Sequence, residues 1–348
     1  MCMLDAARAR PRQRWTSAPL PVRRAGIRSV AIELPEGRIT NEQLGERFGV
    51  GEDWILSRTG IRERCQAAPD ERLSDYATRA AAKALERASV APADVDLVIV
   101  ATTTADELQP NTAPLVAHGI GTVGAGAFDV GSGCTGLLSA IAAATAQIET
   151  SRAEHVVVVG ADFITRINNY DDRRIGPVFA DGAGAMLLGP SAPETGRTTD
   201  PVDVGLIGPV VLGSDGSQAD TIIVTHEERK IHMDGPEVFR HAVQRMGEVT
   251  MLALERAGLG LDDIDLFVYH QANARITRTL GQRLGLPAER VVDCIEHYGN
   301  ASAATIPVAL TVALEDGRLR EGANVLLCAF GSGFTWGAGV VRWGSARA

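Results

Sequence analysis

The chain has 348 residues, a formal net charge of −9, 45% hydrophobic and 22% charged residues. These are the values of a globular protein, and the length suits two fused domains or one large α/β unit. No apolar run approaches the roughly 18 residues that would span a bilayer, so we expect no membrane partner.

The positive charge is concentrated at the N-terminus. Residues 1–24 contain six arginines and a single acid, a net charge of +5 that leaves −14 on the remainder. An acidic body of this kind is a poor surface for nucleic acid, so we expect no nucleic-acid partner except through this basic segment. The segment lacks the apolar core of a secretory signal. We therefore interpret residues 1–25 as a flexible basic extension, from an over-long start assignment rather than a targeting sequence.

Apolar, β-rich runs alternate with alanine-rich helical patterns along the rest of the chain. This alternation is typical of an α/β fold with buried strands. The predicted strands are, in chain order, 97–103, 156–160, 266–270, 324–330 and 338–343.

An internal repeat divides the chain. Residues 84–100 (ALERASVAPADVDLVIV) align without gaps to residues 253–269 (ALERAGLGLDDIDLFVY), with eight of seventeen positions identical. The copies lead to the glycine-bearing turns GSGCTGLLSAI (131–141) and HYGNASAATIPVAL (297–310). We predict a duplicated α/β protein with an N-terminal half at 26–195 and a C-terminal half at 196–348, which brings Cys134 and Asn300 to equivalent turns.

The five cysteines are scattered and form no C-x-x-C pair, which argues against a disulfide framework or a zinc site and favours a reducing cytoplasm. Cys134 lies between a predicted strand and a helix that begins near Thr135. The positive end of a helix dipole would lower the pKa of this thiol and favour thiolate. The alternative is a buried structural thiol, and the flanking glycines favour the nucleophile, because their backbone can approach a substrate.

Two neutral groups could assist such a nucleophile. His270 ends a predicted strand, where α/β folds place their sites, and Asn300 follows Gly299 in the repeated turn. Each also has a structural interpretation, as a satisfied polar residue or a turn residue. A thiolate with two neutral donors suits attack on an acyl thioester, followed by stabilisation of the enolate that decarboxylation generates.

Six motifs together resemble the β-ketoacyl-acyl-carrier-protein synthase III family of the thiolase-like superfamily, over about residues 26–343. They are DWILSRTGIRER (53–64), AFDVGSGCTG (127–136), VFADGAGAMLLG (178–189), HQANARI (270–276), HYGNASAATIP (297–307) and FGSGFTWG (330–337). The resemblance implies a five-layer αβαβα fold, a homodimer, and a catalytic triad of Cys134, His270 and Asn300.

The resemblance also implies roles at the substrate sites. The substrates are coenzyme A thioesters, with no cofactor and no metal, and acyl carrier protein is a partner. Trp54 and Arg58 would pack against the adenine of coenzyme A, and Arg173 would meet its nucleotide end. Asn273 and Arg275 would line the pantetheine tunnel or the carrier-protein face.

The chain departs from the family pattern in two places that concern the substrate. The second oxyanion amide, beside that of Cys134, falls at Ser332, where the family has glycine, and Phe330 opens this motif at the acyl pocket. Gln109 stands where housekeeping members have phenylalanine, in a pocket wall contributed by the dimer partner. A glutamine there favours a starter unlike plain acetyl, as in relatives from specialised metabolism.

We therefore predict an acyltransferase of the condensing type: an acyl-CoA loads Cys134, and a malonyl thioester on coenzyme A or carrier protein then attacks to give a β-ketoacyl thioester. The main alternative is an acyltransferase that passes the acyl group to a hydroxyl, an amine or a carrier without forming a carbon–carbon bond. A catalytically silent scaffold is the third possibility, and the presence of Cys134 counts against it. The starter, and the choice between fatty-acid and polyketide pathways, stay open.

Overall fold

Two mixed β-sheets organise the chain in the computed structural model, which describes residues 23–193 and 203–344. The strands of the first sheet, in spatial order, are β1 (Ala25–Glu33), β7 (Asp181–Pro190), β6 (Val156–Phe163), β4 (Leu97–Ala101) and β5 (Gly126–Val130). β4 runs parallel to both β5 and β6, whereas β7 is antiparallel to β1 and β6. β5 therefore forms one edge of this sheet.

The second sheet repeats this plan. Its strands, in spatial order, are β10 (Val211–Ser214), β15 (Thr335–Arg342), β14 (Asn324–Gly331) and β13 (Leu266–Tyr269). β13 is parallel to β14, and β15 is antiparallel to its two neighbours. An isolated parallel bridge from Phe267 to Val291 occupies the position beside β13 that β5 takes beside β4. The matching order and directions confirm the internal duplication.

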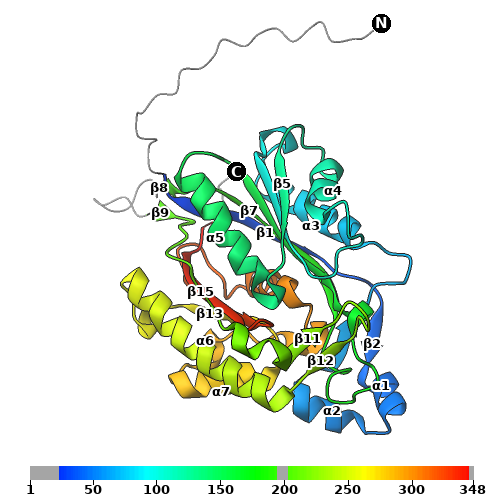
Figure 1. The fold of residues 1–348 in the computed structure, drawn as a ribbon. Helices are drawn as coiled ribbons and strands as arrows, with labels where there is room; N and C mark the ends of the chain where they lie inside the picture. The colour runs from blue at the N-terminus through cyan, green and yellow to red at the C-terminus, as the bar shows by residue number, and fades with distance from the viewer. Residues whose placement is uncertain (1–22, 194–202, 345–348) are drawn as a thin grey trace, which may run out of the picture.

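The helices form three layers around the two sheets (Figure 1). The six that do so are α5 (Gly136–Glu149) and α9 (Thr305–Glu315) between the sheets, α3 (Leu73–Arg87) and α4 (Thr112–Gly119) on the outer face of the first sheet, and α6 (Gly235–Ala257) and α7 (Ala274–Leu284) on the outer face of the second. The resulting arrangement is the predicted five-layer αβαβα fold. α5 and α9 are apolar on nearly all sides because both of their faces are covered by a sheet.

Two glycines let the C-terminal half lie directly against the first sheet. A Cβ atom on Gly160 of β6 would lie 2.3 Å from the carbonyl oxygen of Ala303, and one on Gly184 of β7 would lie 2.3 Å from Cβ of Pro307. Side chains at these positions would push away η7 (Ser302–Ala304) and the first turn of α9. The turn before η7 is tied to the N-terminal half where the backbone amide of Asn300 donates to the carbonyl of Val178, at 3.1 Å.

Shorter elements connect the layers. They are β2 (Arg38–Thr40), α1 (Asn41–Phe48), α2 (Glu52–Thr59), β3 (Glu63–Cys65), β8 (Ala192–Pro193), β9 (Asp203–Val204), β11 (Ile222–Val224), β12 (Ile231–Met233), α8 (Ile295–Tyr298) and the 3₁₀ helices η1 (Pro92–Asp94), η2 (Gly133–Thr135), η3 (Ile164–Ile167), η4 (Gly216–Thr221), η5 (Leu261–Asp263), η6 (Ala288–Arg290) and η7 (Ser302–Ala304). None of the helices in the described ranges has the length and apolar character to cross a bilayer.

The predicted domain limits fall largely outside the described residues. The basic extension at 1–25 is described only from residue 23, and Ala25 already belongs to β1 and is buried. The limit between 195 and 196 lies in the segment 194–202, which is also outside the described residues. The predicted strands are confirmed, with ends that differ by a few residues.

Candidate active site

A cavity of about 1450 Å³ is lined by residues from both halves of the chain. Cys134, His270 and Asn300 all contribute to its wall. They come from corresponding places in the duplicated fold, since Cys134 lies in η2 before α5 and Asn300 precedes η7, which leads into α9. The predicted triad residues therefore share one cavity.

Cys134 carries a protonated thiol in the resting protein. Its side chain is partly accessible, and its Sγ lies 3.5 Å from the Oγ atom of Ser302. Burial of the sulfur raises the pKa of Cys134 to about 11, although the hydroxyl of Ser302 opposes the rise. The expectation that the helix N-terminus would favour thiolate is therefore wrong, because desolvation penalises the charged form more strongly.

His270 follows β13 and is neutral. Its backbone amide donates to the carbonyl of Cys328 at 2.8 Å, and its Nδ1 lies 2.6 Å from the Oγ1 atom of Thr305. Burial lowers the pKa of His270 to about 3. When the Thr305 hydroxyl donates to Nδ1, the proton of the ring resides on Nε2, which can then donate. The same hydroxyl lies 3.0 Å from the carbonyl oxygen of Ser302, its alternative acceptor.

The side-chain amide of Asn300 is oriented by the next turn. Its Oδ1 accepts a hydrogen bond from the backbone amide of Ser302 at 2.9 Å. The residue is buried, and its own backbone carbonyl accepts from Ala180 at 2.9 Å. Because the oxygen is occupied, the NH₂ group is the part of the amide that is left to donate toward a substrate.

The loop that contains Ser332 packs against the nucleophile turn. Thr135 of η2 and Thr335 of β15 share a hydrogen bond of 2.7 Å between their hydroxyls, and Thr335 also donates to the carbonyl of Ser332 at 3.0 Å. Ser332 is not among the four described non-glycine residues with positive φ, so its side chain imposes no backbone strain. The serine in place of glycine is compatible with this loop.

The predicted coenzyme A residues lie at the mouth of the cavity. The indole ring of Trp54 has the guanidinium of Arg58 at 4.2 Å and that of Arg173 at 5.4 Å from its centroid. Asn273 is the N-cap of α7, where it accepts from the backbone amide of Arg275 at 2.9 Å, and it also donates to the carbonyl of Arg58 at 3.1 Å. All five residues line the cavity.

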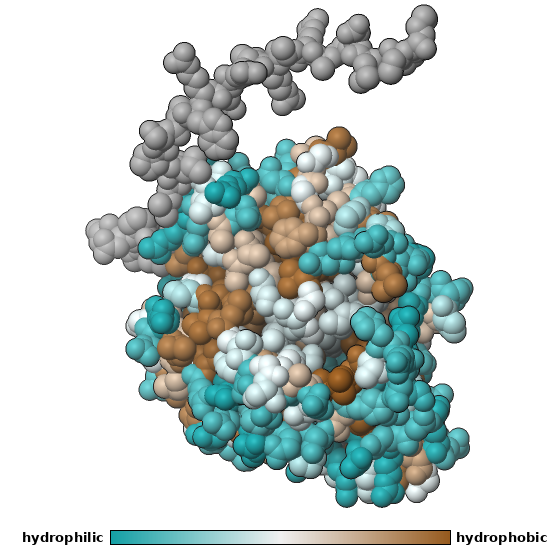
Figure 2. Space-filling view, viewed as in Figure 1, coloured by the Kyte–Doolittle hydropathy of each residue, from teal (hydrophilic) through white to brown (hydrophobic). Residues whose placement is uncertain are grey.

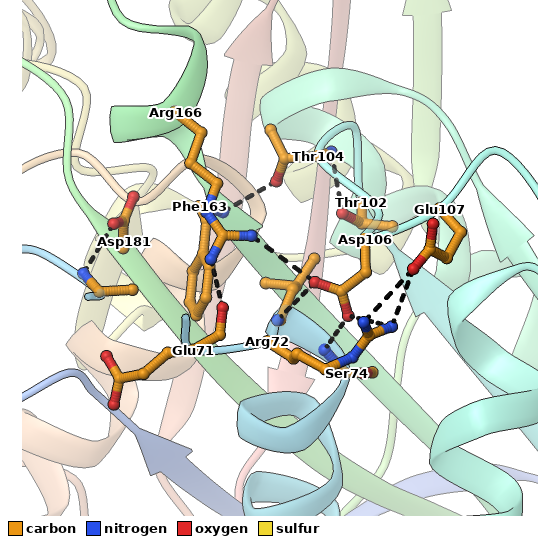
Figure 3. Close-up of polar contacts among 12 residues, drawn as sticks. Glu71, Arg72, Ser74, Thr102, Thr104, Asp106, Glu107, Phe163, Arg166 and Asp181 are labelled. Atoms are coloured by element: carbon orange, nitrogen blue, oxygen red, sulfur yellow. Dashed lines mark hydrogen bonds and ion pairs between the residues drawn. The ribbon is translucent and has the colours of Figure 1, made fainter. Parts of the chain in front are cut away.

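Of the two acyl-pocket residues, only Phe330 lines the cavity of its own chain. Gln109 is exposed, while its neighbour Leu108 contributes to the cavity wall. Both belong to the loop between β4 and α4. Figure 3 shows the contacts that hold this loop: Asp106 accepts from the backbone amides of Leu73 and Ser74 at 2.8 and 2.9 Å.

Three residues of the site were not predicted from the sequence: Ser302, Thr305 and Asp162. Ser302 and Thr305 lie two and five positions after Asn300, within the motif HYGNASAATIP (297–307). Their short spacing at the start of a helix is the sequence signal that could have identified them. Asp162 is fully buried near the end of β6, and no local pattern marks it.

Comparison with known proteins identifies the family. Residues 128–205 match the family model described as 3-oxoacyl-[acyl-carrier-protein (ACP)] synthase III, and residues 254–343 match the model of its C-terminal part. The chain is 41% identical over 320 residues to the β-ketoacyl-[acyl-carrier-protein] synthase III of Listeria welshimeri, which covers 92% of this chain and 99% of the relative. The chain belongs to the β-ketoacyl-acyl-carrier-protein synthase III family.

Solved structures agree with this assignment. The 3-oxoacyl-(acyl carrier protein) synthase III of Pseudomonas aeruginosa is 37% identical, with a TM-score of 0.86 over 94% of this chain and all of the other. The priming β-ketosynthase of the R1128 polyketide biosynthetic pathway is 32% identical, with a TM-score of 0.87 over 95% of this chain and all of the other. The thiolase-like synthase III fold is thus established, and the chain is a condensing enzyme of this family.

Proposed function

We propose that this synthase III condenses an acyl-CoA starter with a malonyl thioester through an acyl-cysteine intermediate. The observation that carries the proposal is the convergence of a cysteine thiol, a neutral imidazole and an oriented carboxamide on one cavity: Cys134, His270 and Asn300. A charged imidazolium is not required, because a neutral donor suffices for a developing enolate.

In the loading half-reaction the sulfur of Cys134 attacks the thioester carbonyl of the starter. The thiol loses its proton as it attacks, a tetrahedral oxyanion forms, and its collapse expels coenzyme A, whose sulfur takes up a proton. The backbone amides of Cys134 and Ser332 are the proposed donors to this oxyanion. The segments that contain them are joined by the hydrogen bond between the hydroxyls of Thr135 and Thr335. The cysteine is left as a thioester.

In the second half-reaction the malonyl thioester loses carbon dioxide, and the electron pair of the broken bond becomes an enolate. His270 through Nε2 and Asn300 through its NH₂ group donate to the enolate oxygen. The enolate carbon then attacks the acyl group on Cys134, which forms the carbon–carbon bond and expels Cys134 as a thiolate that takes up a proton from water. The carboxylate leaves as carbon dioxide, so no carboxylate base is needed to make the carbanion.

Coenzyme A and a carrier-bound substrate would both enter at the arginine-rich mouth. Arg58, Arg173 and Arg275 lie around it, and guanidinium groups are suited to the phosphates of either ligand. We propose that adenine packs on the ring of Trp54, which requires one of the two flanking guanidinium groups to move aside.

We further propose that the enzyme is a homodimer joined along β5. This strand is an unpaired edge of the first sheet, and Phe128 within it is 40% exposed. Leu108 and Val123 nearby in the chain are 92% and 91% exposed. In Figure 2 apolar side chains gather on the face that carries α5 and β5. An exposed edge strand flanked by apolar side chains is suited to pairing with a second copy.

The proposal is tested by intact-mass measurement after exposure to a panel of acyl-CoAs, followed by addition of malonyl thioester. We expect an acyl adduct on Cys134, no adduct in Cys134→Ala, and an unchanged adduct in the control Cys328→Ala. Release of carbon dioxide together with a product two carbons longer than the starter supports condensation. An undiminished adduct in Cys134→Ala, or transfer of the acyl group to a hydroxyl or amine without carbon dioxide, would refute it. The adduct itself identifies the starter.

A further inference from the structure

The hydroxyl of Thr305 is hydrogen-bonded to one ring nitrogen of His270 and leaves the other for the cavity. Thr305 is the first residue of α9 and is 2% exposed. Its Oγ1 lies 2.6 Å from Nδ1 of His270, and it is the hydrogen-bond partner of this nitrogen among the described residues. Because a neutral imidazole carries one ring proton, the bond at Nδ1 determines whether Nε2 is a donor or an acceptor.

Two arrangements of protons are possible around Oγ1 of Thr305. The backbone N–H of Gln271 donates to this oxygen at 3.3 Å, and the carbonyl oxygen of Ser302 lies 3.0 Å away. In the first arrangement the hydroxyl donates to Nδ1 of His270, so the ring proton is on Nε2. In the second the hydroxyl donates to Ser302 and Nδ1–H donates to Oγ1, which leaves a lone pair on Nε2. Only the first arrangement provides a donor for an enolate.

The distances favour the first arrangement. The 2.6 Å between Oγ1 of Thr305 and Nδ1 of His270 is shorter than the roughly 2.7–3.2 Å usual for an N–H donor and falls in the range of roughly 2.5–3.0 Å for an O–H donor. The 3.0 Å to the carbonyl of Ser302 is at the long end of that O–H range. This carbonyl also accepts the backbone N–H of Thr305, so it stays hydrogen-bonded when the hydroxyl turns to Nδ1.

The segment that carries His270 is held rigidly against Thr305. The next residue, Gln271, is 2% exposed, and its side-chain NH₂ group donates to the carbonyls of Tyr269 and Val292, at 2.8 and 3.1 Å. The backbone N–H of Gln271 is thereby fixed beside Oγ1 of Thr305. Since this N–H can only donate, it occupies a lone pair of the oxygen and leaves the hydroxyl proton for another acceptor.

We propose that Thr305 is a positioning residue for decarboxylation, because its hydroxyl donates to Nδ1 of His270 and thereby keeps the ring proton on Nε2, the donor to the enolate oxygen. No bond is made or broken at Thr305 itself. Burial lowers the pKa of His270 to about 3, so the ring is neutral and Thr305 sets its tautomer rather than its charge. The inference rests on the proposed function, since the enolate exists only if a malonyl thioester is decarboxylated.

Three variants test this role. Thr305→Val removes the hydroxyl at nearly constant volume, and Thr305→Ser retains it. Thr311→Val is the matched control, because Thr311 lies in the same helix, is 1% exposed, and has an Oγ1 atom without a hydrogen-bond partner in the described part of the chain.

The first measurement is independent of any substrate. The ¹⁵N NMR spectrum of histidine-labelled protein at pH 8 reports which ring nitrogen of His270 is protonated, and His270→Gln identifies the signals by their loss. We expect a protonated Nε2 and an unprotonated Nδ1 in wild type, in Thr305→Ser and in Thr311→Val. In Thr305→Val the shift of Nδ1 should move toward that of a protonated nitrogen, because the donor to its lone pair is gone.

The second measurement follows acyl loading of Cys134 and, separately, decarboxylation of malonyl thioester. We expect Thr305→Val to lower kcat for decarboxylation about 10- to 100-fold, less than the 10² to 10³ for loss of a donor itself, because His270 is still present. KM and the loading rate should stay within threefold of wild type, since the enolate charge appears only in the decarboxylation transition state. Thr305→Ser should restore kcat to within fivefold, and Thr311→Val should match wild type.

A protonated Nδ1 in the wild-type ring would overturn the inference, and so would decarboxylation by Thr305→Val within threefold of wild type. Equal losses in Thr305→Val and Thr305→Ser, or equal losses of loading and decarboxylation, would also overturn it, because they would indicate a distorted helix start rather than a missing hydroxyl. If wild type decarboxylates no malonyl thioester, the proposed function fails, and the ¹⁵N spectra still decide whether Thr305 holds the proton on Nε2.

Discussion

The titratable side chains of the triad are uncharged in the resting site. Burial raises the pKa of Cys134 to about 11 and lowers that of His270 to about 3. A thiolate and imidazolium pair is therefore not the ground state of this cavity. In the proposed mechanism, charge forms only as substrates react, first on the sulfur and the oxyanion and later on the enolate, and the two events use different donors.

His270→Ala and Asn300→Ala should separate these events. Loading of Cys134 should remain within an order of magnitude of wild type, because neither residue contacts the first oxyanion in the proposed mechanism. Decarboxylation should fall by 10² to 10³, corresponding to about 3–4 kcal/mol for one lost donor to a developing oxyanion. Rapid-quench measurement of acyl-enzyme and of released carbon dioxide distinguishes the steps. Normal condensation in both variants would contradict the assignment of the donors.

Burial of neutral His270 also predicts a pH dependence of stability. In the unfolded chain the imidazole has its ordinary pKa near 6.5, and in the folded chain its pKa is about 3. Between these values the unfolded state binds the extra proton, so stability is lost as the pH falls below 6.5. From pH 8 to pH 5 this residue should cost about 2 kcal/mol, since each unit is worth about 1.4 kcal/mol.

Urea unfolding of wild type and His270→Gln at pH 8 and at pH 5 measures this cost. Other titrating groups cancel in the comparison, so the difference in unfolding free energy between the two proteins should shift by about 2 kcal/mol in favour of the variant at pH 5. If the difference in unfolding free energy between the two proteins is the same at pH 8 and at pH 5, His270 is protonated at pH 5 in the folded protein as it is in the unfolded chain.

Sequence motifs predicted Cys134, His270 and Asn300, because these residues sit at strand ends and helix starts that are recognisable locally. They could not predict Asp162, which is 140 positions from Ser302 in the chain. Its hydrogen bond with the backbone amide of Ala303 depends on β6 and η7 meeting at Gly160, and this contact exists only in the folded chain. The thiol pKa was predicted in the wrong direction for the same reason, since a local helix start is visible in the sequence and desolvation is not.

At the scale of elements, the loop of residues 102–111 joins β4 to α4, and its residues 103–108 line the cavity. Asp106 fixes it to the N-terminus of α3, with Arg72 and Arg166 each 3.7 Å away (Figure 3). Burial alone would raise the pKa of Asp106, but the amides of Ser74 and Leu73 and the charge of Arg72 hold it below its ordinary value. The strands on either side were predicted from their apolar runs, whereas this loop has no periodic pattern from which its shape could be predicted.

Asp106→Ala should therefore destabilise the protein by about 1–2 kcal/mol, since it removes the acceptor for two helix N-terminal amides and leaves two guanidinium groups without this partner. Glu107→Ala is the control, because Glu107 pairs with Arg72 at the surface and such exposed pairs contribute less than about 1 kcal/mol. Urea denaturation gives both values. Equal effects of the two substitutions would show that Asp106 does not cap α3.

At the scale of the whole molecule, β5 ends the first sheet with an edge that a second copy can extend. The start of α4 is tied to this strand, because the backbone amides of Thr112 and Ala113 donate to Asp129 of β5. Gln109, in the loop before α4, is exposed and does not line the cavity that holds Cys134. Within the described ranges, the second sheet has no full strand that corresponds to β5. Beside β13, at the place that β5 takes beside β4, the described residues form only the isolated bridge from Phe267 to Val291. In the proposed homodimer, the loop before α4 would contribute to the selectivity of the other protomer's site.

Gln109→Phe should shift the ratio of kcat/KM toward short unsubstituted acyl-CoAs. If the glutamine amide enters the partner's acyl pocket, it needs a hydrogen-bond partner, since an unpaired buried amide costs about 1–3 kcal/mol. A starter with a carbonyl, hydroxyl or carboxylate supplies that partner and an alkyl chain does not. The shift should accordingly be roughly 10-fold or more in a competition between paired acyl-CoAs.

Mixed dimers determine whether Gln109 acts across the interface. In one dimer, Gln109→Phe is placed in the protomer with an intact Cys134, and its partner carries Cys134→Ala. The working pocket then receives a glutamine from the partner, and the selectivity should be that of wild type. In the other dimer both substitutions are in the same protomer, so the intact pocket receives phenylalanine and the selectivity should shift. The opposite pattern would place Gln109 in the pocket of its own chain, and unchanged selectivity in both dimers would mean that Gln109 does not contact the acyl group.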